Sequence, residues 1–292
     1  MLELNVKMPT TYAHWRFGCD CIETLPDNLK EIVHSNRELF DIGVHGPDVF
    51  FYDLRHSDVV AYGYETHFKD GRDFFERAVK VYKENDEDKD AMLAYLLGFL
   101  SHFALDSQCH GYVDRKKEVS GISHNKIEAE YDAHLMRTDG KAVNLVNRSE
   151  SLRPNKFTAR IMARFFPFDE KTMLRTTRMH HLIISTLVCK SSFKRNFFYK
   201  TMDKLNLKDH RDLLVIPEEM AECADSNLRL DKLRAHALAI YPELVEDFLN
   251  AINNDTELPR YFDHNFEPWD DYKEIPILSY EEELEYKPEL RK

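Results

Sequence analysis

The chain has little glycine or proline, and no segment is rich in either. Only 9 Gly and 11 Pro occur among the 292 residues, and no Gly/Ser-rich, Pro-rich or repeated stretch separates one half from the other. A flexible linker is therefore not indicated, and we expect one compact domain over residues 1–292. A chain of this length can bury a sizeable core.

Long apolar runs are also missing. No run approaches the roughly 20 apolar residues of a membrane-spanning helix, and residues 1–18 lack the basic and apolar segments of an export signal. Five cysteines are an odd number, which argues against a fully paired secreted framework. We therefore expect a cytoplasmic protein without a transmembrane segment.

An excess of basic charge is absent as well. The chain carries 40 basic and 52 acidic residues, which gives a net charge of −12. This balance disfavours duplex nucleic acid as a partner. It does not exclude a phosphate pocket, because bound metal ions would supply local positive charge that the count omits.

What the sequence does contain is helical periodicity, and the fold class that we predict is all-α. The one candidate for an extended segment covers residues 59–64. Thr24 and Pro26 mark a helix start, and Gly43 marks its end. A further helix begins at Pro242, and amphipathic helices are predicted over residues 72–85, 87–109, 123–138, 155–166, 170–188, 193–205 and 217–240.

One stretch concentrates side chains that bind metals. His102, Asp106 and His110 are spaced by four residues, and His124 and Glu128 repeat that spacing. Four residues advance about 400° along an α-helix, so each group stays on one face. Imidazole and carboxylate ligands together suit a divalent cation such as zinc.

A His-xxx-Asp pair on a helix is commonly a hydrogen-bonded core pair or a solvated ion pair. Here His102 and Asp106 lie in an otherwise apolar stretch, where ionisable groups are costly unless they are paired or coordinated. Gly111 and Gly121 bracket a charged connector over residues 114–118. We expect this connector to let a second helix fold back, so that two ligand faces meet and favour a metal site.

Further motifs stand upstream, namely YAHW at residues 12–15, GPD at 46–48 and ETHF at 65–68. With them the chain resembles the zinc-dependent phospholipase C family, whose fold is shared by the S1/P1-type nucleases. The resemblance covers roughly residues 8–140 and makes that part the metal-site half. Residues 150–253 would then add further helices, and residues 254–292 would form an acidic C-terminal arm.

The resemblance implies two or three zinc ions around one phosphate pocket. The first zinc would be held by Asp48, His67, His102 and Asp106, and the second by His110, His124 and Glu128. Asp106 would bridge the first zinc to a third, which is bound by His14 and the backbone at the N-terminus of the chain. A chain that begins at Pro9, after Met8, would place a free amine near His14.

The family pattern also implies phosphodiester hydrolysis by a metal-activated water, with Asp48 as zinc ligand and candidate general base. Phe51 and Tyr64 are candidate substrate contacts. Val49 stands where choline-specific relatives carry an aromatic side chain, so the expected substrate is a phospholipid or another small phosphodiester. An S1/P1-like single-strand nuclease and a non-catalytic zinc protein are the alternatives.

Other histidines and carboxylates receive structural interpretations. Adjacent His180 and His181 point about 100° apart on a helix and are interpreted as core and surface residues. His45 and His56 flank Asp48 and are interpreted as solvated loop residues, with replacement of a missing metal ligand by one of them as the alternative. Asp132 continues the face of Glu128, where a hydrogen bond to a ligating histidine is a minority alternative.

Overall fold

The structure is a computed structural model that describes residues 11–204, 208–269 and 271–290. Over these residues it contains α-helices and short 3-10 helices and no β-strand, which confirms the all-α prediction. No helix in the described ranges is long and apolar enough to cross a bilayer. The five cysteines are free thiols.

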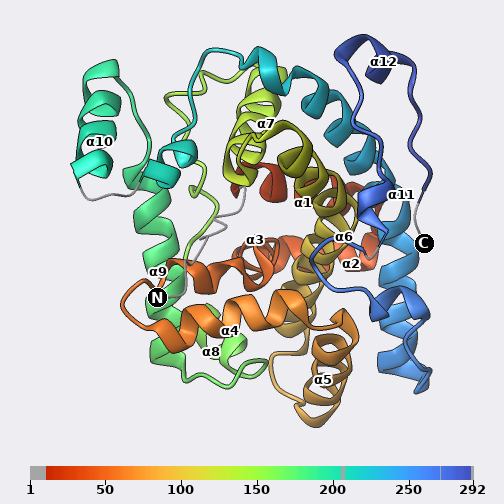
Figure 1. Cartoon of the computed structure of the whole chain (residues 1–292). Coiled ribbons are helices and arrows are strands. Elements are labelled where there is room, and N and C mark those ends of the chain that lie inside the picture. Colours follow the sequence, from red (N-terminus) through yellow and green to blue (C-terminus); the bar gives the residue numbers. More distant parts are fainter. Residues whose placement is uncertain (1–10, 205–207, 270, 291–292) are drawn as a thin grey trace.

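The helices follow one another around a central element (Figure 1). The α-helices are α1 Thr11–Thr24, α2 Asp27–Ser35, α3 Arg37–Gly43, α4 Ser57–Phe68, α5 Gly71–Glu84, α6 Lys89–Ser120, α7 His124–Thr138, α8 Lys156–Ala163, α9 Glu170–Thr186, α10 Ser192–Lys204, α11 Ala224–Asn254 and α12 Tyr280–Glu285. The 3-10 helices are η1 Gly46–Tyr52, η2 Lys208–Leu213, η3 Ala221–Cys223, η4 Arg260–Asp263 and η5 Tyr272–Glu274.

Helix α6 lies at the centre of the bundle, and every residue from Ala91 to Val113 is buried. Helices α3 and α11 pack along it. Glycine permits the close approach of α3: a Cβ on Gly43 would lie 2.3 Å from the carbonyl oxygen of Tyr95, and a Cβ on Gly98 would lie 2.3 Å from that of Phe40. The metal-binding residues predicted on α6 therefore sit in the middle of the core.

The predicted connector over residues 114–118 is wrong, because α6 continues unbroken to Ser120. The chain turns only at Gly121, which has a positive φ of 74° that favours glycine. The charged residues fit into the helix because Lys116 is buried and pairs with Asp225 on α11. Helix α7 then starts at the Ser123 cap, whose hydroxyl accepts from the Lys126 N–H.

Four other features differ from the sequence predictions. Residues 59–64 belong to helix α4 and are not extended. Helix α11 runs through Pro242 without a break, and the neighbouring Tyr241 donates a 3.0 Å hydrogen bond to the Leu97 carbonyl oxygen in the core. Helix α1 was not predicted, and the helix expected between Thr24 and Gly43 is divided at Asn36 into α2 and α3.

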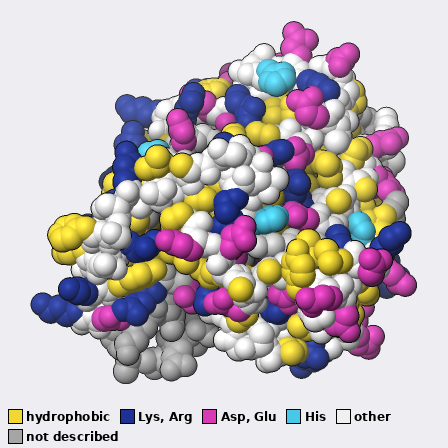
Figure 2. Space-filling model, turned by 90° about the horizontal axis from the view of Figure 1, so that it is seen from above, with side chains coloured by type: hydrophobic (Ala, Val, Ile, Leu, Met, Phe, Trp, Pro, Cys, Tyr) yellow, Lys and Arg dark blue, Asp and Glu magenta, His cyan; other side chains and the backbone are white. Residues whose placement is uncertain are grey.

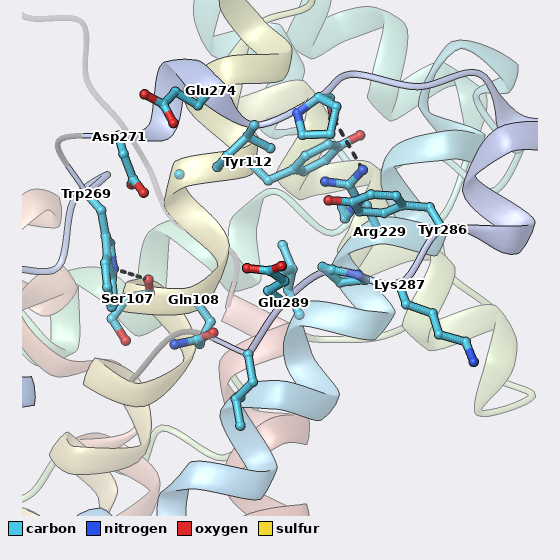
Figure 3. Close-up of a pocket in the computed structure, with 16 residues that line it drawn as sticks. Ser107, Gln108, Tyr112, Arg229, Trp269, Asp271, Glu274, Tyr286, Lys287 and Glu289 are labelled. Carbon is cyan, nitrogen blue, oxygen red and sulfur yellow. Dashed lines mark hydrogen bonds between the residues drawn. The ribbon is translucent and has the colours of Figure 1, made fainter.

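The C-terminal segment after α11 returns across α5, α6 and α11. Glu283 on α12 forms a buried bidentate ion pair with Arg229, whose guanidinium lies 4.9 Å and 4.2 Å from the ring centres of Tyr112 and Tyr286. A cavity of about 590 Å³ lies here (Figure 3). The segment is thus a packed part of the molecule, while the surface seen in Figure 2 mixes acidic and basic side chains.

Candidate metal centre

The structure brings all eight predicted metal ligands into one buried region. His14 comes from α1, Asp48 from η1, His67 from α4, three residues from α6 and two from α7. Their potential ligand atoms form three groups, each with all atoms within 4.8 Å of one another: His14, His102 and Asp106; Asp48, His67 and His102; and His110, His124 and Glu128. Their roles as ligands stay a prediction.

Asp106 lies where these groups meet. Its Oδ1 is 3.2 Å from Nε2 of His14 and 3.8 Å from Nε2 of His110, while its Oδ2 is 2.9 Å from Nε2 of His102. The two carboxylate oxygens therefore face histidines of different groups. Asp106 is placed as a bridging ligand would be.

Asp48 is the second carboxylate that approaches His102, in addition to Asp106. Its Oδ1 is 2.8 Å from Nε2 of His67 and 3.9 Å from Nε2 of His102. Gly46 allows this approach, because it has a φ of +46° and a Cβ there would lie 2.2 Å from Cδ2 of the His102 ring. The start of η1 therefore depends on a residue without a side chain.

The third group joins α6 to α7. Oε1 of Glu128 lies 3.0 Å from Nε2 of His124 and 3.5 Å from Nε2 of His110. The four-residue spacing of His124 and Glu128 on α7 makes the shorter contact local, as the helical period requires. The fold supplies His110 from the facing helix.

Several ligand-type atoms here are buried without a hydrogen bond to any described residue. They include Oδ2 of Asp48, Nε2 of His102, Oδ2 of Asp106 and Oε2 of Glu128. Nε2 of His102 and Oδ2 of Asp106 lie 2.9 Å apart, but the direction of the ring N–H does not meet the geometry of a hydrogen bond. Buried oxygen and nitrogen atoms are costly without hydrogen bonds. A cation bound between these atoms would satisfy them.

Three of the histidines are held in orientation by a contact of their Nδ1 atom. Nδ1–H of His67 donates to the Gly63 carbonyl oxygen at 2.7 Å, and that of His110 donates to the Phe266 carbonyl oxygen at 2.5 Å. Nδ1 of His124 bonds Oδ1 of Asp114 at 2.8 Å. Each contact fixes the ring and directs Nε2 toward the centre, which is the arrangement typical of metal-bound histidine.

The electrostatics of the centre also favour a cation. Burial alone would raise the pKa of Asp106, but His102, His110 and His14 outweigh it and hold the pKa well below its usual value. Burial likewise opposes the shift of Glu128, yet the neighbouring histidines lower its pKa to about 2. The carboxylates are therefore ionised, and positive charge balances them in the interior.

Residues 13–171 match the family model described as zinc dependent phospholipase C. The match covers 159 of the 292 residues, more than half of the chain. The chain belongs to this family. The resemblance inferred from the motifs is thereby confirmed, and the protein is a member of a hydrolase family. No curated protein and no solved structure matches the chain.

In this zinc-dependent phospholipase C family member, Asp132 bonds none of the candidate ligand histidines within the described residues. Its carboxylate accepts from the backbone N–H groups of Tyr12 at 3.2 Å and Ala13 at 2.8 Å, and Arg148 pairs with it at 3.2 Å. It therefore satisfies the first turn of α1 from a distant helix. This contact places His14.

His45 is buried, so its interpretation as a solvated loop residue is wrong. It lies 5.1 Å from His180, whose ring stacks on Tyr52 at 3.9 Å. Burial lowers the pKa of His180 to about 3, so the imidazole is neutral. His181 is half-buried on the same helix and bonds the Ser149 carbonyl oxygen, which agrees with its surface assignment.

The two predicted substrate contacts lie beside His67. Phe51 is buried and stacks on the His67 ring at 4.9 Å, and Tyr64 packs against Phe51 at 4.5 Å. Both support His67, and contact with substrate stays a prediction. The backbone expected to complete the third site, including Pro9, lies outside the described residues.

Sequence reasoning missed the supporting residues Gly63, Asp114 and Phe266. Two of them act through backbone carbonyl oxygens, which carry no sequence signature. Asp114 had a usable signal, since it lies ten residues before His124 in a charged run, but the run was interpreted as a connector.

Proposed function

We propose that this protein hydrolyses phosphodiesters in the manner of phospholipase C, with a phospholipid or another small phosphodiester as substrate. The observation that carries the proposal is the overlap of the three ligand groups. His102 belongs to two of them, and Asp106 also approaches His110 of the third. Overlap of this kind gathers several ligand positions around one small volume, which suits reaction at a single phosphate.

The proposed assignment follows the family pattern and uses two or three zinc ions. One ion takes Asp48, His67, His102 and Asp106, and another takes His110, His124 and Glu128. His14 and Asp106 belong to the third position. The geometry supports this division because the two oxygens of Asp106 face different histidines.

Zinc held by these residues would lower the pKa of water toward neutrality and polarise a phosphoryl oxygen. Asp48 is the proposed proton acceptor, because its Oδ2 is buried and makes no hydrogen bond with a described residue. Its Oδ1 is held by His67. Burial of the whole centre strengthens electrostatic contacts to a substrate phosphate.

Turnover by the zinc-reconstituted protein tests the proposal on three substrates in parallel: a soluble phosphocholine diester, a phospholipid dispersion and a single-stranded oligonucleotide. We expect hydrolysis of the first two, and a loss of about a hundredfold or more in Asp48→Asn, which removes both ligand charge and proton acceptor. Glu65→Gln is the matched control, since Glu65 is exposed on α4 and pairs only with Lys69 at 2.6 Å among the described residues.

Two outcomes would contradict the proposal. Hydrolysis of the oligonucleotide alone would assign the protein to the nuclease alternative. Stoichiometric zinc without turnover of any of the three would assign it to the non-catalytic alternative.

A further inference from the structure

Helix α10 differs from the rest of the bundle because none of its residues is buried. In Figure 1 it stands at the upper left, apart from the helices that surround α6. Within the described residues it contacts mainly η2. A helix in this position needs an explanation other than core packing.

One face of α10 attaches it to the protein. Nζ of Lys194 donates to the carbonyl oxygens of Thr186 and Val188, both at 2.8 Å, and lies 5.4 Å from the Phe198 ring centre. The Arg211 guanidinium lies 5.1 Å from the ring centre of Tyr199. These contacts use the inner face and fix the helix against the end of α9.

The opposite face presents two phenyl rings and two ammonium groups. Phe193 is 81% exposed and Phe197 is 60% exposed. At about 100° per residue, Phe193, Phe197, Lys200 and Lys204 fall within an arc of about 60°. Lys200 and Lys204 are exposed and form no ion pair with any described residue.

The positive charge is a local property of this segment. Residues 190–204 contain five Lys or Arg and one Asp, a net charge of 5 − 1 = +4, so the remainder of the chain carries −12 − 4 = −16. At the left edge of Figure 2, where α10 projects, hydrophobic side chains stand beside Lys and Arg. An acidic protein thus exposes, on one projecting helix, apolar rings together with two lysines that have no ion-pair partner in the described part of the chain.

We propose that α10 docks the protein on a membrane surface that contains anionic lipid. The phenyl rings at its N-terminal end would enter the boundary between headgroups and acyl chains, as the apolar face of an interfacial helix does. Lys204 lies about 16 Å further along the helix and would meet lipid phosphates. Each lysine near such a surface contributes about 1 kcal/mol, or about fivefold in partitioning.

Charge complementarity favours an anionic bilayer over a protein partner at this surface of α10. An apolar groove of a protein partner would accept the rings but would leave Lys200 and Lys204 without a counter-charge. A second copy of this acidic chain would bring the same unpaired lysines together on the two-fold axis of the contact. A bilayer with anionic headgroups satisfies the rings and the cations at once.

Sedimentation with vesicles of phosphatidylcholine, with and without phosphatidylserine, tests the docking on the zinc-loaded protein. We expect binding to the anionic vesicles that weakens with salt. Lys200→Glu with Lys204→Glu should lower the partition coefficient by about tenfold or more. Phe193→Ser with Phe197→Ser should lower it by about tenfold because the rings no longer insert.

The matched control variants make the same kinds of substitution at exposed residues outside α10. Leu284→Ser removes a side chain that is 56% exposed on α12, at the other side of Figure 1. Lys80→Glu with Lys171→Glu repeats the charge change on exposed residues of α5 and α9. We expect both controls to bind within about twofold of the parent protein, as exposed sites outside the contact should.

Several results would overturn the proposal: no binding of the parent protein to anionic vesicles, equal losses in the α10 and control variants, or an effect of the α10 variants on self-association or oligonucleotide binding alone. The docking does not rest on the proposed hydrolysis, since sedimentation requires no turnover. If both hold, the α10 variants should lose turnover of vesicle phospholipid and keep turnover of the soluble diester.

Discussion

Nε2 of His14 lies 3.2 Å from Oδ1 of Asp106, so the first helix meets the central helix at a shared carboxylate. This relationship depends on Asp132, which holds the N-terminal turn of α1 through the backbone of Tyr12 and Ala13. A carboxylate that contacts backbone N–H groups and Arg148 thus determines where one of the candidate ligands lies.

Asp106→Asn should reduce zinc content more than Glu128→Gln does. Asp106 approaches three candidate histidines, namely His14, His102 and His110. Glu128 contacts only two of the candidates, His110 and His124. An amide is a poorer zinc ligand than a carboxylate. Metal analysis of the purified variants should show about one zinc lost in Glu128→Gln and more than one in Asp106→Asn. Full zinc content in both variants would refute the ligand assignment.

Zinc binding at pH 7 should release protons. Burial opposes the shift, yet Asp106 and Glu128 raise the pKa of His110 in the metal-free protein to about 10, so this imidazole is protonated at pH 7. Zinc requires the neutral ring. The apparent affinity should therefore rise with pH, by up to about tenfold per unit for this proton until the pH nears 10.

Calorimetry in buffers of different ionisation enthalpy measures this proton release, and an affinity independent of pH would contradict it. The same shift has a second effect on the metal-free protein. Because the folded pKa of His110 is raised above its ordinary value of 6.5, the ionic contribution to stability is complete below that pH and disappears as the pH rises toward 10.

Gly46→Ala should damage the centre, whereas Gly140→Ala should not. Both glycines have positive φ, but a Cβ on Gly46 would lie 2.2 Å from His102, while a Cβ on Gly140 would meet nothing within 4 Å. We expect about 1 kcal/mol of backbone strain in Gly140→Ala and a larger loss, with reduced zinc content, in Gly46→Ala. Urea unfolding and metal analysis measure both effects, and equal behaviour would argue against tight packing at His102.

Phe266→Ala should weaken zinc binding as well as the fold. The Phe266 ring is fully buried, with its centre 5.7 Å from those of both His67 and His102. Phe248 is the matched control, since it is fully buried against Phe75 on the α5 side. Each truncation should cost about 3–5 kcal/mol of stability. Zinc titration of the folded fraction should show weaker binding only in Phe266→Ala, and equal affinities would restrict Phe266 to general packing.

The parts of the site that follow from the sequence are those within a single helix. His102, Asp106 and His110 share a face because the helical period is local, so their spacing was informative. The connector prediction is wrong because a run of charged residues need not be exposed to solvent. Lys116 instead pairs with Asp225, which lies on a helix more than a hundred residues later. No local pattern contains that pairing.

The N-terminal helix illustrates the same limit. The backbone N–H groups of its first turn donate to Asp132, which lies more than a hundred residues later in the sequence, so no local pattern reveals this contact. The family resemblance nevertheless identified His14. A family motif marks residues that tertiary contacts bring together, whereas helical periodicity reports only neighbours along one helix.

The contacts of Phe266 also set an order of events during synthesis. Its carbonyl oxygen accepts from His110, and its N–H donates to the His67 carbonyl oxygen. A ribosome makes the chain from the N-terminus, so every candidate ligand has been polymerised before Phe266 is added. A chain that has not yet reached residue 266 therefore lacks both contacts, and the His110 ring gains its Nδ1 partner only when Phe266 packs beside it.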